Sequence, residues 1–485
     1  MDFLHKATLL EQTLNMEIGE QVNKLATYTF SNFIRCKEVQ EAIKEHSINY
    51  EMPHMRFVYI YYLFKKIHDF IGDKEILDVF NREFAKKNIR NPTLQDVSKV
   101  CTAMDVNDKT EICLILEKLT RGQNQNVLWE VLRDGVISSS KLLKIIKQQT
   151  PDSKIFHPVP IEKNHYVASP IAFGVRNEVT VKTLLAEFVS PSGTSNINDF
   201  GFMLSPLDGI FGVSLDMCCK CSIEKDGRVA FDADTEIYEI KCRYKYLFAK
   251  NEYDPIYKAY SELYNNPGKA ALVNFISAIQ KPAVEHVPRG KLPTQNDYLL
   301  SFDKVWNFNP QIKKRRMTSQ HKLTEQCMRY NCYTESKVII LTDPALTSGK
   351  IDIKDTFFVD VYVNPRHSYY YQCLLQYKIV TNYIQFSSSS AKGLGKPQTF
   401  LVTAFFRKRN SSDFAKTYIK SESNFVDQAL EIPVLLIITP VFVPHEPLIE
   451  TLEQAITFWQ SSVKEEFNQW PWAPVSLGAS GDVTP

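Results

Sequence analysis

The sequence predicts an α/β fold in which a central mixed sheet is flanked by helices and preceded by a mostly helical N-terminal lobe. In the first 120 or so residues, apolar positions recur at helical spacing and strand-like runs are few. From about residue 165 onward, short apolar runs alternate with amphipathic segments, which is typical of an α/β core. With 485 residues and 44% hydrophobic content, the chain can bury a large core.

The helical lobe is expected over residues 1–125. Its clearest signals are Phe57–Ile71 and Ile112–Leu119, where apolar residues return every three or four positions. A further helical signal covers Trp129–Ile146 and is broken near Gly135. The sequence therefore predicts a lobe at 1–125, an α/β core at 126–470 and a disordered tail at 471–485.

The core is expected to alternate strands with helices. Loops are expected at about 283–320 and 387–397, where polar residues, Gly and Pro gather. The predicted strands are Asp199–Met203, Phe211–Met217, Thr235–Cys242, Val338–Leu341, Phe357–Val363, Phe400–Phe406 and Val434–Val443. The predicted helices are Phe173–Phe188, Ala270–Gln280, Pro365–Val380 and Leu448–Phe467.

Charge and composition limit the classes of function. The 57 basic and 55 acidic residues nearly cancel, so nucleic-acid binding would use a local groove and not a uniformly basic surface. Ten cysteines without regular spacing indicate reduced thiols inside a cell. The apolar stretch Ile432–Val443 is too short for a membrane span, and no secretory signal is visible. We expect a soluble intracellular protein without a membrane partner.

Two predicted strands bring together charged residues suited to phosphodiester hydrolysis. Asp216 ends the strand Phe211–Met217, and Glu239 and Lys241 lie on the strand Thr235–Cys242. Residues i and i+2 of a strand share a face, so Glu239 and Lys241 project together while Ile240 faces the apolar side. Magnesium prefers one or two carboxylates and keeps several waters.

This pattern predicts a magnesium site of the PD-(D/E)XK nuclease type. Asp216 and Glu239 would hold the cation, joined by the Ile240 carbonyl, and Lys241 would orient the attacking water. The tripeptide alone is a weak signal, and a surface strand with alternating charges is the alternative. Similar tripeptides occur at 152–154, 335–337 and 352–354, but only 239–241 combines a strand, apolar flanks and an upstream Asp-ending strand.

Two sequence blocks resemble a known family. The blocks GFMLSPLDGIFGVSLDMCC and TEIYEIKCRYKYLF resemble the herpesviral alkaline nucleases, especially the gammaherpesvirus shutoff and exonuclease proteins. The resemblance spans most of the chain and is strongest over about 129–380. It implies a fold like that of phage lambda exonuclease and Mg²⁺-dependent digestion of linear double-stranded DNA from 5′-phosphate ends, with Mn²⁺ as a substitute. It also implies internal cutting of messenger RNA that shuts off host expression, in the host nucleus and cytoplasm. We expect a monomer.

The resemblance assigns a terminal-phosphate site to the segment Trp129–Ser140. Arg133 would offer a bidentate fork to phosphate oxygens, and Ser138 and Ser140 would add hydroxyl donors. The alternative for the serines is a helix N-cap before Lys141, and the two readings are compatible because a helix N-terminus attracts anions.

The resemblance assigns two further contacts near the metal. Glu178, in the segment Phe173–Glu178, would bind the cation directly or through water. Ser214, two residues before Asp216 on the same strand face, would touch the same phosphate. A solvated helix glutamate is the alternative for Glu178.

A helix beginning at Asn364 resembles the family's glutamine motif. Asn364 as N-cap and Pro365 at the first helical position would start it. Tyr369, Gln372 and Gln376 then share a face, with Gln372 favoured for contacting the attacking water or a phosphate. The alternative is an amphipathic helix whose aromatic residues only pack.

Several features leave alternatives open. Arg243 extends the active strand and could follow the nucleic-acid backbone. The basic run Lys313–Arg316 suits a nuclear-import signal, a nucleic-acid grip or a solvated loop. Cys218, Cys219 and Cys221 could suggest zinc, but core thiols are favoured. The rival hypothesis is a nuclease-fold protein that does not cut. It would bind nucleic acid or recruit host RNA decay factors instead.

Overall fold

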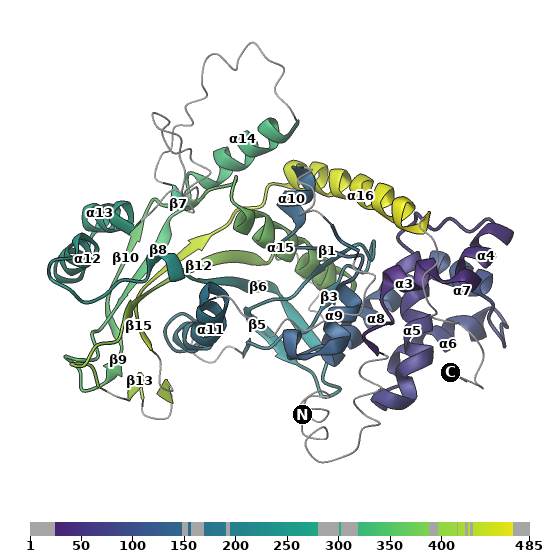
Figure 1. Cartoon of the computed structure of the whole chain (residues 1–485), viewed down its shortest axis with the longest axis horizontal. Coiled ribbons are helices and arrows are strands. Elements are labelled where there is room, and N and C mark those ends of the chain that lie inside the picture. Colours follow the sequence, from purple (N-terminus) through teal and green to yellow (C-terminus); the bar gives the residue numbers. More distant parts are fainter. Residues whose placement is uncertain are drawn as a thin grey trace, which may run out of the picture.

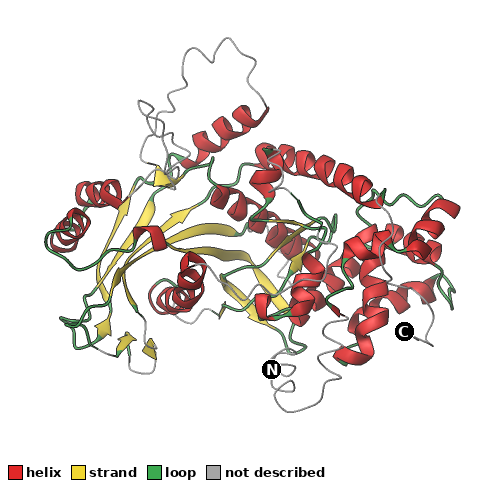
Figure 2. Ribbon diagram, in the orientation of Figure 1, coloured by secondary structure: helices red, strands yellow, loops and turns green. Residues whose placement is uncertain are grey.

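The computed structural model describes residues 25–147, 154–156, 169–190, 195–279, 300–301, 319–387, 396–414, 416–421, 425–426 and 430–468. The basic run Lys313–Arg316 and the predicted tail 471–485 lie outside these residues. Of the predicted loop 283–320, only residues 300–301 and 319–320 are described. Helices gather at one end of the molecule and long strands fill its middle (Figure 2).

The helical lobe follows the apolar periodicity. The predicted helix Phe57–Ile71 is found as α5, Met55–Ile71, and Ile112–Leu119 forms most of α8, Val106–Leu119. α5 ends where Gly72 takes a φ of 68°, which glycine adopts without steric strain. The other helices of the lobe are α3 (Phe30–Arg35), α4 (Lys37–Glu45), α6 (Glu75–Lys86) and α7 (Leu94–Ala103).

The helical signal of Trp129–Ile146 is interrupted near Gly135, as predicted. α9 covers Val127–Arg133 and α10 covers Leu142–Ile146. Between them the chain turns at Gly135, with a φ of 71°, into the short strand β1. β1 (Ile137–Ser138) pairs in parallel with β4 (Phe211–Val213), and β4 pairs antiparallel with β3 (Met203–Leu204).

A seven-stranded mixed sheet forms the centre of the molecule, in the order β10-β8-β15-β12-β6-β5-β2. β6 and β12 are parallel, and the other neighbouring strands are antiparallel. β6 is therefore an interior strand with a partner on each side. The strands are β2 (Asn196–Ile197), β5 (Met217–Ile223), β6 (Val229–Cys242), β8 (Ser336–Leu341), β10 (Ile353–Val359), β12 (Gln398–Lys408) and β15 (Glu431–Pro440).

Two long helices cover opposite faces of this sheet (Figure 1). α11 (Ser169–Phe188) packs on the face that carries Ile240 of β6. α15 (Ser368–Phe386) packs on the face that carries Ile237. Because side chains alternate along a strand, the odd-numbered residues of β6 point toward α15.

The predicted strand Phe211–Met217 is wrong as a single element. β4 ends at Val213 in the small sheet, and β5 begins at Met217 in the central sheet. The residues between them cross from one sheet to the other. The carboxylate of Asp216 accepts a backbone hydrogen bond there, which takes the place of strand pairing.

The predicted strand Asp199–Met203 is also mostly irregular. Its amides bond to α8 instead of to a strand: Gly201 N donates to Glu117 Oε1 at 2.9 Å and Phe202 N donates to Thr120 Oγ1 at 2.7 Å. These side-chain acceptors satisfy the backbone, so the segment needs no strand partner.

The predicted start of the glutamine-motif helix is wrong by three residues. α15 begins at Ser368, with His367 as N-cap accepting from Tyr369 N at 3.3 Å. Asn364 Oδ1 instead accepts from Arg366 N at 2.9 Å, closing an Asx turn ahead of the helix. The face shared by Tyr369, Gln372 and Gln376 is unaffected.

The remaining elements surround the central sheet. Among the described residues, no helix combines the length and apolar character needed to cross a membrane. The remaining elements are α12 (Pro255–Asn265), α13 (Lys269–Ile279), α14 (Ser319–Asn331), α16 (His445–Phe467), β7 (Leu300–Ser301), β9 (Lys350–Ile351), β11 (Tyr362–Val363), β13 (Thr417–Ile419), β14 (Phe425–Val426) and the 3-10 turns η1 (Gln123–Gln125) and η2 (Tyr244–Tyr246).

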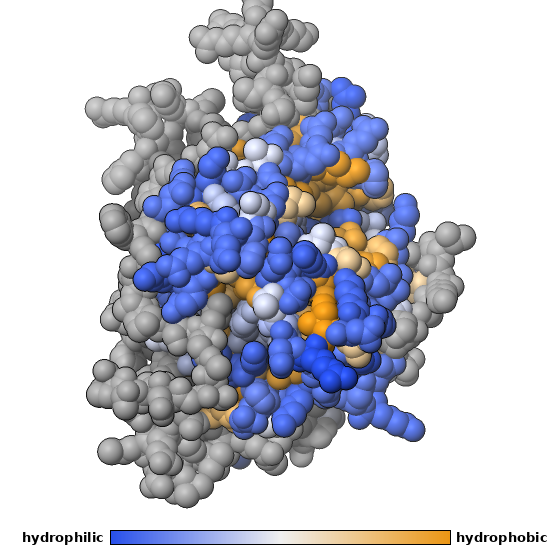
Figure 3. Space-filling view, turned by 90° about the vertical axis from the view of Figure 1, so that its right-hand side faces the viewer, coloured by the Kyte–Doolittle hydropathy of each residue, from blue (hydrophilic) through white to orange (hydrophobic). Residues whose placement is uncertain are grey.

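One hydrophobic core joins the helical lobe to the sheet. It contains side chains of α3 and α5 as well as Val131, Ile237 and Trp459. α16, near the end of the described chain, packs against α3, near its beginning, through the buried ion pair Arg35–Glu466. The division at residue 125 stays a prediction. The face of the molecule on the side of the helical lobe is mainly hydrophilic, with smaller hydrophobic areas between (Figure 3).

Candidate active site

The switch between the two sheets places Asp216 beside β6. The pairing of β5 with β6 reaches Met217 opposite Tyr238 and stops. Beyond that point, Ile240 N donates to Asp216 Oδ2 at 2.7 Å. The N–H and C=O of one strand residue point to the same side of the strand. The Ile240 carbonyl therefore also faces the side where Asp216 lies.

Glu239 and Lys241 lie together on the face of β6 that α15 covers. The Glu239 side chain is buried, with an exposed fraction of only 5%. One of its oxygens pairs with Lys241 Nζ and the other accepts from Gln376 Nε2. Lys241 Nζ also lies 5.0 Å from the centre of the Tyr369 ring. Two charged residues of β6 and two residues of α15 thus form one cluster, as the strand and helix spacings predict.

The surroundings of Asp216 disfavour the ionised form of its carboxyl group. Burial and the neighbouring Glu239 carboxylate raise the pKa of Asp216 to about 8, and Lys241 offsets part of this. Burial disfavours the Lys241 ammonium, but Glu239 and Asp216 outweigh it and raise its pKa above the usual value. The raised pKa of Asp216 shows that Lys241 alone does not balance two carboxylates here, and a bound cation would favour the ionised form of Asp216.

The donor set fits a hard divalent cation with few protein ligands. Over the described part of the chain, no three His, Cys, Asp or Glu side chains converge as a preformed metal cage. Magnesium does not need one, because it is commonly held by one or two carboxylates and water. Asp216, Glu239 and the Ile240 carbonyl would hold it here.

Glu178 lies on the other face of the sheet from Glu239 and Lys241. It is on α11, across the sheet from α15, and pairs with Lys182 at 2.8 Å. Its charge still contributes to raising the pKa of Asp216. Glu178 is thus a neighbour of Asp216 with a partner of its own, and metal binding by Glu178 stays a prediction.

Arg243 and the glutamine-motif helix line the side of the cluster next to Lys241. Arg243 Nη1 donates to Tyr369 Oη at 3.0 Å. Gln372 Oε1 has no hydrogen-bond partner among the described residues, so it can still accept from a bound molecule. Burial and nearby cations, first among them Arg243, lower the pKa of His367 to about 3, so this histidine is neutral at physiological pH.

Two of the predicted phosphate residues, Arg133 and Ser214, are linked through Trp129, a contact that the sequence prediction did not include. The Arg133 guanidinium lies 4.0 Å from the centre of the Trp129 ring. Trp129 Nε1 donates to Ser214 Oγ at 2.8 Å, which ties α9 to the segment that precedes Asp216. The spacing of Trp129 and Arg133 by four in a predicted helix is a signal that could have identified the stack.

Two expectations for the serines are corrected. Ser214 lies beyond the end of β4, so it does not share a strand face with Asp216. Ser138 Oγ and Ser140 Oγ lie 3.1 Å apart, but neither caps α10, whose N-cap is Lys141 without a side-chain bond. The pair of hydroxyls is consistent with the phosphate assignment, which stays a prediction.

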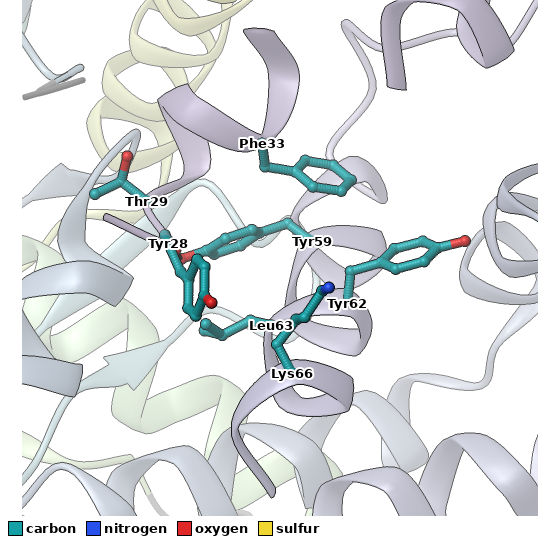
Figure 4. Close-up of a pocket in the computed structure, with 7 residues that line it drawn as sticks. All are labelled: Tyr28, Thr29, Phe33, Tyr59, Tyr62, Leu63 and Lys66. Carbon is teal, nitrogen blue, oxygen red and sulfur yellow. Dashed lines mark hydrogen bonds between the residues drawn. The ribbon is translucent and has the colours of Figure 1, made fainter. Parts of the chain in front are cut away.

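A hollow lies within the helical lobe, apart from this cluster (Figure 4). Aromatic rings form most of its wall and its lining contains no carboxylate, so it lacks the ligand type that Mg²⁺ prefers. It is lined by Tyr28, Thr29, Phe33, Tyr59, Tyr62, Leu63 and Lys66.

Comparison with known proteins assigns the family. The model of the family described as viral alkaline exonuclease matches residues 20–477. The chain belongs to the viral alkaline exonuclease family. It is therefore a nuclease, and the predicted family resemblance is confirmed.

Individual relatives of this viral alkaline exonuclease match along its whole length. It is 67% identical over 485 residues to the shutoff alkaline exonuclease of Alcelaphine herpesvirus 1 (strain C500), covering 100% of both chains. The crystal structure of the shutoff and exonuclease protein from Kaposi's sarcoma-associated herpesvirus matches with a TM-score of 0.79 and 40% identity, covering 98% of this chain and 97% of that one. This match confirms the predicted fold class.

Two further solved structures contain nucleic acid. A KSHV SOX–RNA complex matches with a TM-score of 0.76 and 40% identity, covering 93% of this chain and 96% of that one. A SOX–DNA complex also matches with a TM-score of 0.76 and 40% identity, covering 96% of each chain.

Proposed function

We propose that this nuclease hydrolyses phosphodiester bonds with Mg²⁺, for which Mn²⁺ can substitute. On linear double-stranded DNA it would act as a 5′-to-3′ exonuclease starting from 5′-phosphate ends. On messenger RNA it would cut internally and so suppress host expression. The observation that carries the proposal is the cluster of Asp216, Glu239 and Lys241 at the point where β5 leaves β6.

Each side chain has a distinct part in the proposed reaction. Bound at Asp216 and Glu239, the cation would polarise the phosphate and lower the pKa of a bound water. Lys241 would orient the attacking water and stabilise the charge that develops on the phosphate oxygens. Gln372, with its unpartnered oxygen, would accept a hydrogen bond from that water.

Residues beside the cluster would hold the nucleic acid. Arg243 and Tyr369 would contact the backbone next to the cut. Arg133, Ser138 and Ser140 would hold a terminal phosphate, with Ser214 fixed nearby through Trp129. That solved relatives hold DNA and RNA supports both substrates for this chain. We propose action as a monomer in the host nucleus and cytoplasm.

Digestion of a linear duplex by the purified protein tests the proposal. A duplex with 5′-phosphates and an internally labelled RNA are incubated with Mg²⁺ or with EDTA, alongside the Lys241→Ala and Asp216→Asn variants. We expect both substrates to be cut only with Mg²⁺ and by neither variant, although both variants bind nucleic acid. Binding without cutting by the wild type would favour the rival function, a platform that recruits host decay factors. Full activity in Asp216→Asn would contradict the site assignment.

A further inference from the structure

The chain between Arg133 and Ser138 is held by side chains from distant parts of the molecule. The carboxylate of Asp134, directly after Arg133, is buried. Its Oδ2 accepts from both the backbone N and the Oγ of Ser31, each at 2.6 Å. Ser31 lies on α3, 103 residues earlier in the chain. This link, here called a tether, fixes Asp134 to the helical lobe.

A second tether comes from Arg56 of α5. Its guanidinium is completely buried and donates from Nη1 to Asp134 O at 2.6 Å and from Nη2 to Leu132 O at 2.8 Å. Phe30 and Tyr59 enclose it, with ring centres 4.5 and 5.3 Å from Cζ. Tyr59 also forms part of the wall of the aromatic hollow (Figure 4). A buried cation that caps carbonyls at the end of α9 fixes the direction in which Arg133 leaves that helix.

The third tether comes from α16. Trp459 Nε1 donates to Gly135 O at 2.8 Å, across 324 residues of sequence. Gly135 has a φ of 71°, and a Cβ there would lie 2.5 Å from Phe30 Cδ1. Hydrogen bonds thus hold Leu132, Asp134 and Gly135 in place, and the packing leaves no room for a side chain at Gly135.

From this geometry we infer that Ser31, Arg56 and Trp459 are positioning residues for the recognition of 5′-phosphate ends of DNA. They hold the turn 132–135, and the turn sets the distance between the Arg133 guanidinium and the hydroxyls of Ser138 and Ser140. This inference rests on the proposed contact of those residues with a terminal phosphate. It gives the helical lobe and α16 a specific part in choosing chain ends over internal sites.

Polar tethers of this kind matter for recognition because a bidentate phosphate contact tolerates little displacement. Internal cutting uses the cluster of Asp216, Glu239 and Lys241, and none of these residues contacts the tethers in the described structure. Loss of a tether should therefore weaken the use of 5′-phosphate ends and leave internal cutting unchanged. A loss of general stability would lower both rates together.

The mildest test removes single hydrogen bonds. Trp459→Phe keeps an aromatic ring in the core but loses the indole N–H, and Ser31→Ala loses only the hydroxyl donor. Steady-state rates are measured on duplexes with 5′-phosphate or 5′-hydroxyl ends and on internally cut RNA. We expect KM for the phosphorylated duplex to rise roughly threefold to tenfold, the effect of about one hydrogen bond, with kcat and both other substrates unchanged.

Matched variants remove buried polar contacts of the same lobe that do not reach the turn. Ser98→Ala loses the hydroxyl bonded to His54 Nε2, and Gln40→Met loses the bond from Gln40 to the Phe467 carbonyl of α16. Neither should change the preference for phosphorylated ends. Equal effects of the test and matched variants, or equal losses on all substrates, would overturn the inference.

A double-variant cycle links the tether to its target. If Trp459 acts through Arg133, Trp459→Phe should have no further effect on end preference in an Arg133→Ala background. Additive effects would show that Trp459 acts elsewhere and would overturn the inference. A wild-type protein with no preference for phosphorylated ends would refute the proposed phosphate site itself, and the positioning inference with it. That outcome is visible before any variant is made.

Discussion

At the scale of single residues, the carboxylates of the active centre already have protein partners. Glu239 accepts from Gln376 and pairs with Lys241, while Asp216 accepts from the Ile240 amide. These contacts fix the orientation of both carboxylates before a metal or a substrate arrives. Hydrogen bonds to side chains that bind a metal usually affect metal affinity as well as rate.

Gln376→Leu should weaken the response to magnesium. Without the amide that orients Glu239, the Mg²⁺ concentration for half-maximal cleavage should rise about 10- to 100-fold. A magnesium titration of the cleavage rate measures this, and high Mg²⁺ should restore most activity. Thr381→Ala on the same helix, which loses only a bond to the Tyr377 carbonyl, is the control. An unchanged magnesium response would show that Gln376 does not support a metal ligand.

His54 should make the protein less stable in mild acid. Burial, with Lys109 nearby, lowers the pKa of His54 to about 4, below its ordinary 6.5. As pH falls from 6.5 toward 4, the unfolded chain takes up a proton and the folded one does not, so stability is lost. The loss from this group is at most about 1.4 kcal/mol per pH unit, and its partly exposed edge reduces that.

Urea unfolding at pH 7 and pH 5 measures this effect in wild type and in His54→Gln. The variant should lose less stability between the two pH values than the wild type does. His445→Gln, at an exposed position, is the control and should behave like wild type. An equal pH response in His54→Gln and wild type would contradict a neutral buried His54.

At the scale of elements, the site depends on where strands stop. The alternation of Glu239, Ile240 and Lys241 could be predicted because a strand has a fixed period of two. The common face of Tyr369 and Gln376 could be predicted from helical spacing in the same way. The crossing of residues 214–216 between two sheets could not, because no local pattern says which strand a segment will pair with.

The errors at element boundaries have a similar cause. Asn364-Pro365 is a good helix start by composition, yet the Asn364 side chain closes a turn before the helix. Gly201 looks like part of a strand, yet its amide bonds to Glu117 of α8. In both cases a specific polar acceptor overrides the local preference, and its position depends on the folded chain.

Gly201→Ala tests the packing of this segment on α8. A Cβ at Gly201 would lie 1.9 Å from the Glu117 carbonyl oxygen, which is backbone and cannot move aside without shifting the helix. We expect Gly201→Ala to lower the free energy of unfolding by about 1–3 kcal/mol or somewhat more. Gly268→Ala, where a Cβ meets nothing within 4 Å, should change it by less than about 0.5 kcal/mol. Equal stability of the two variants would contradict this packing.

At the scale of the whole molecule, the helical lobe and the nuclease sheet share one core. Arg228, just before β6, donates to Glu75 of α6 and Glu111 of α8, so the β5–β6 hairpin is tied to the lobe by charge as well. Trp459 and Gly135 meet across 324 residues, which no local sequence pattern reveals. The sequence indicated two units, but their mutual dependence is visible only in the folded chain.

We therefore expect the lobe and the sheet to unfold together. Thermal or urea unfolding should give one transition, with the same midpoint by far-UV circular dichroism and by tryptophan fluorescence. A chain lacking residues 1–125 should fail to fold, because it exposes the apolar face that the lobe covers. Two separate transitions, or a folded truncated chain, would show that the lobe is an independent domain.

The early end of the β5–β6 pairing makes one backbone amide a reporter of the active centre. The amide of Ile240 donates to the Asp216 carboxylate, whereas its neighbours along β6 bond to other strands. Its exchange with deuterated solvent should thus depend on the charge and occupancy of that carboxylate. Hydrogen–deuterium exchange at this one position could follow cation binding with no substrate present, even in variants too slow to assay by cleavage.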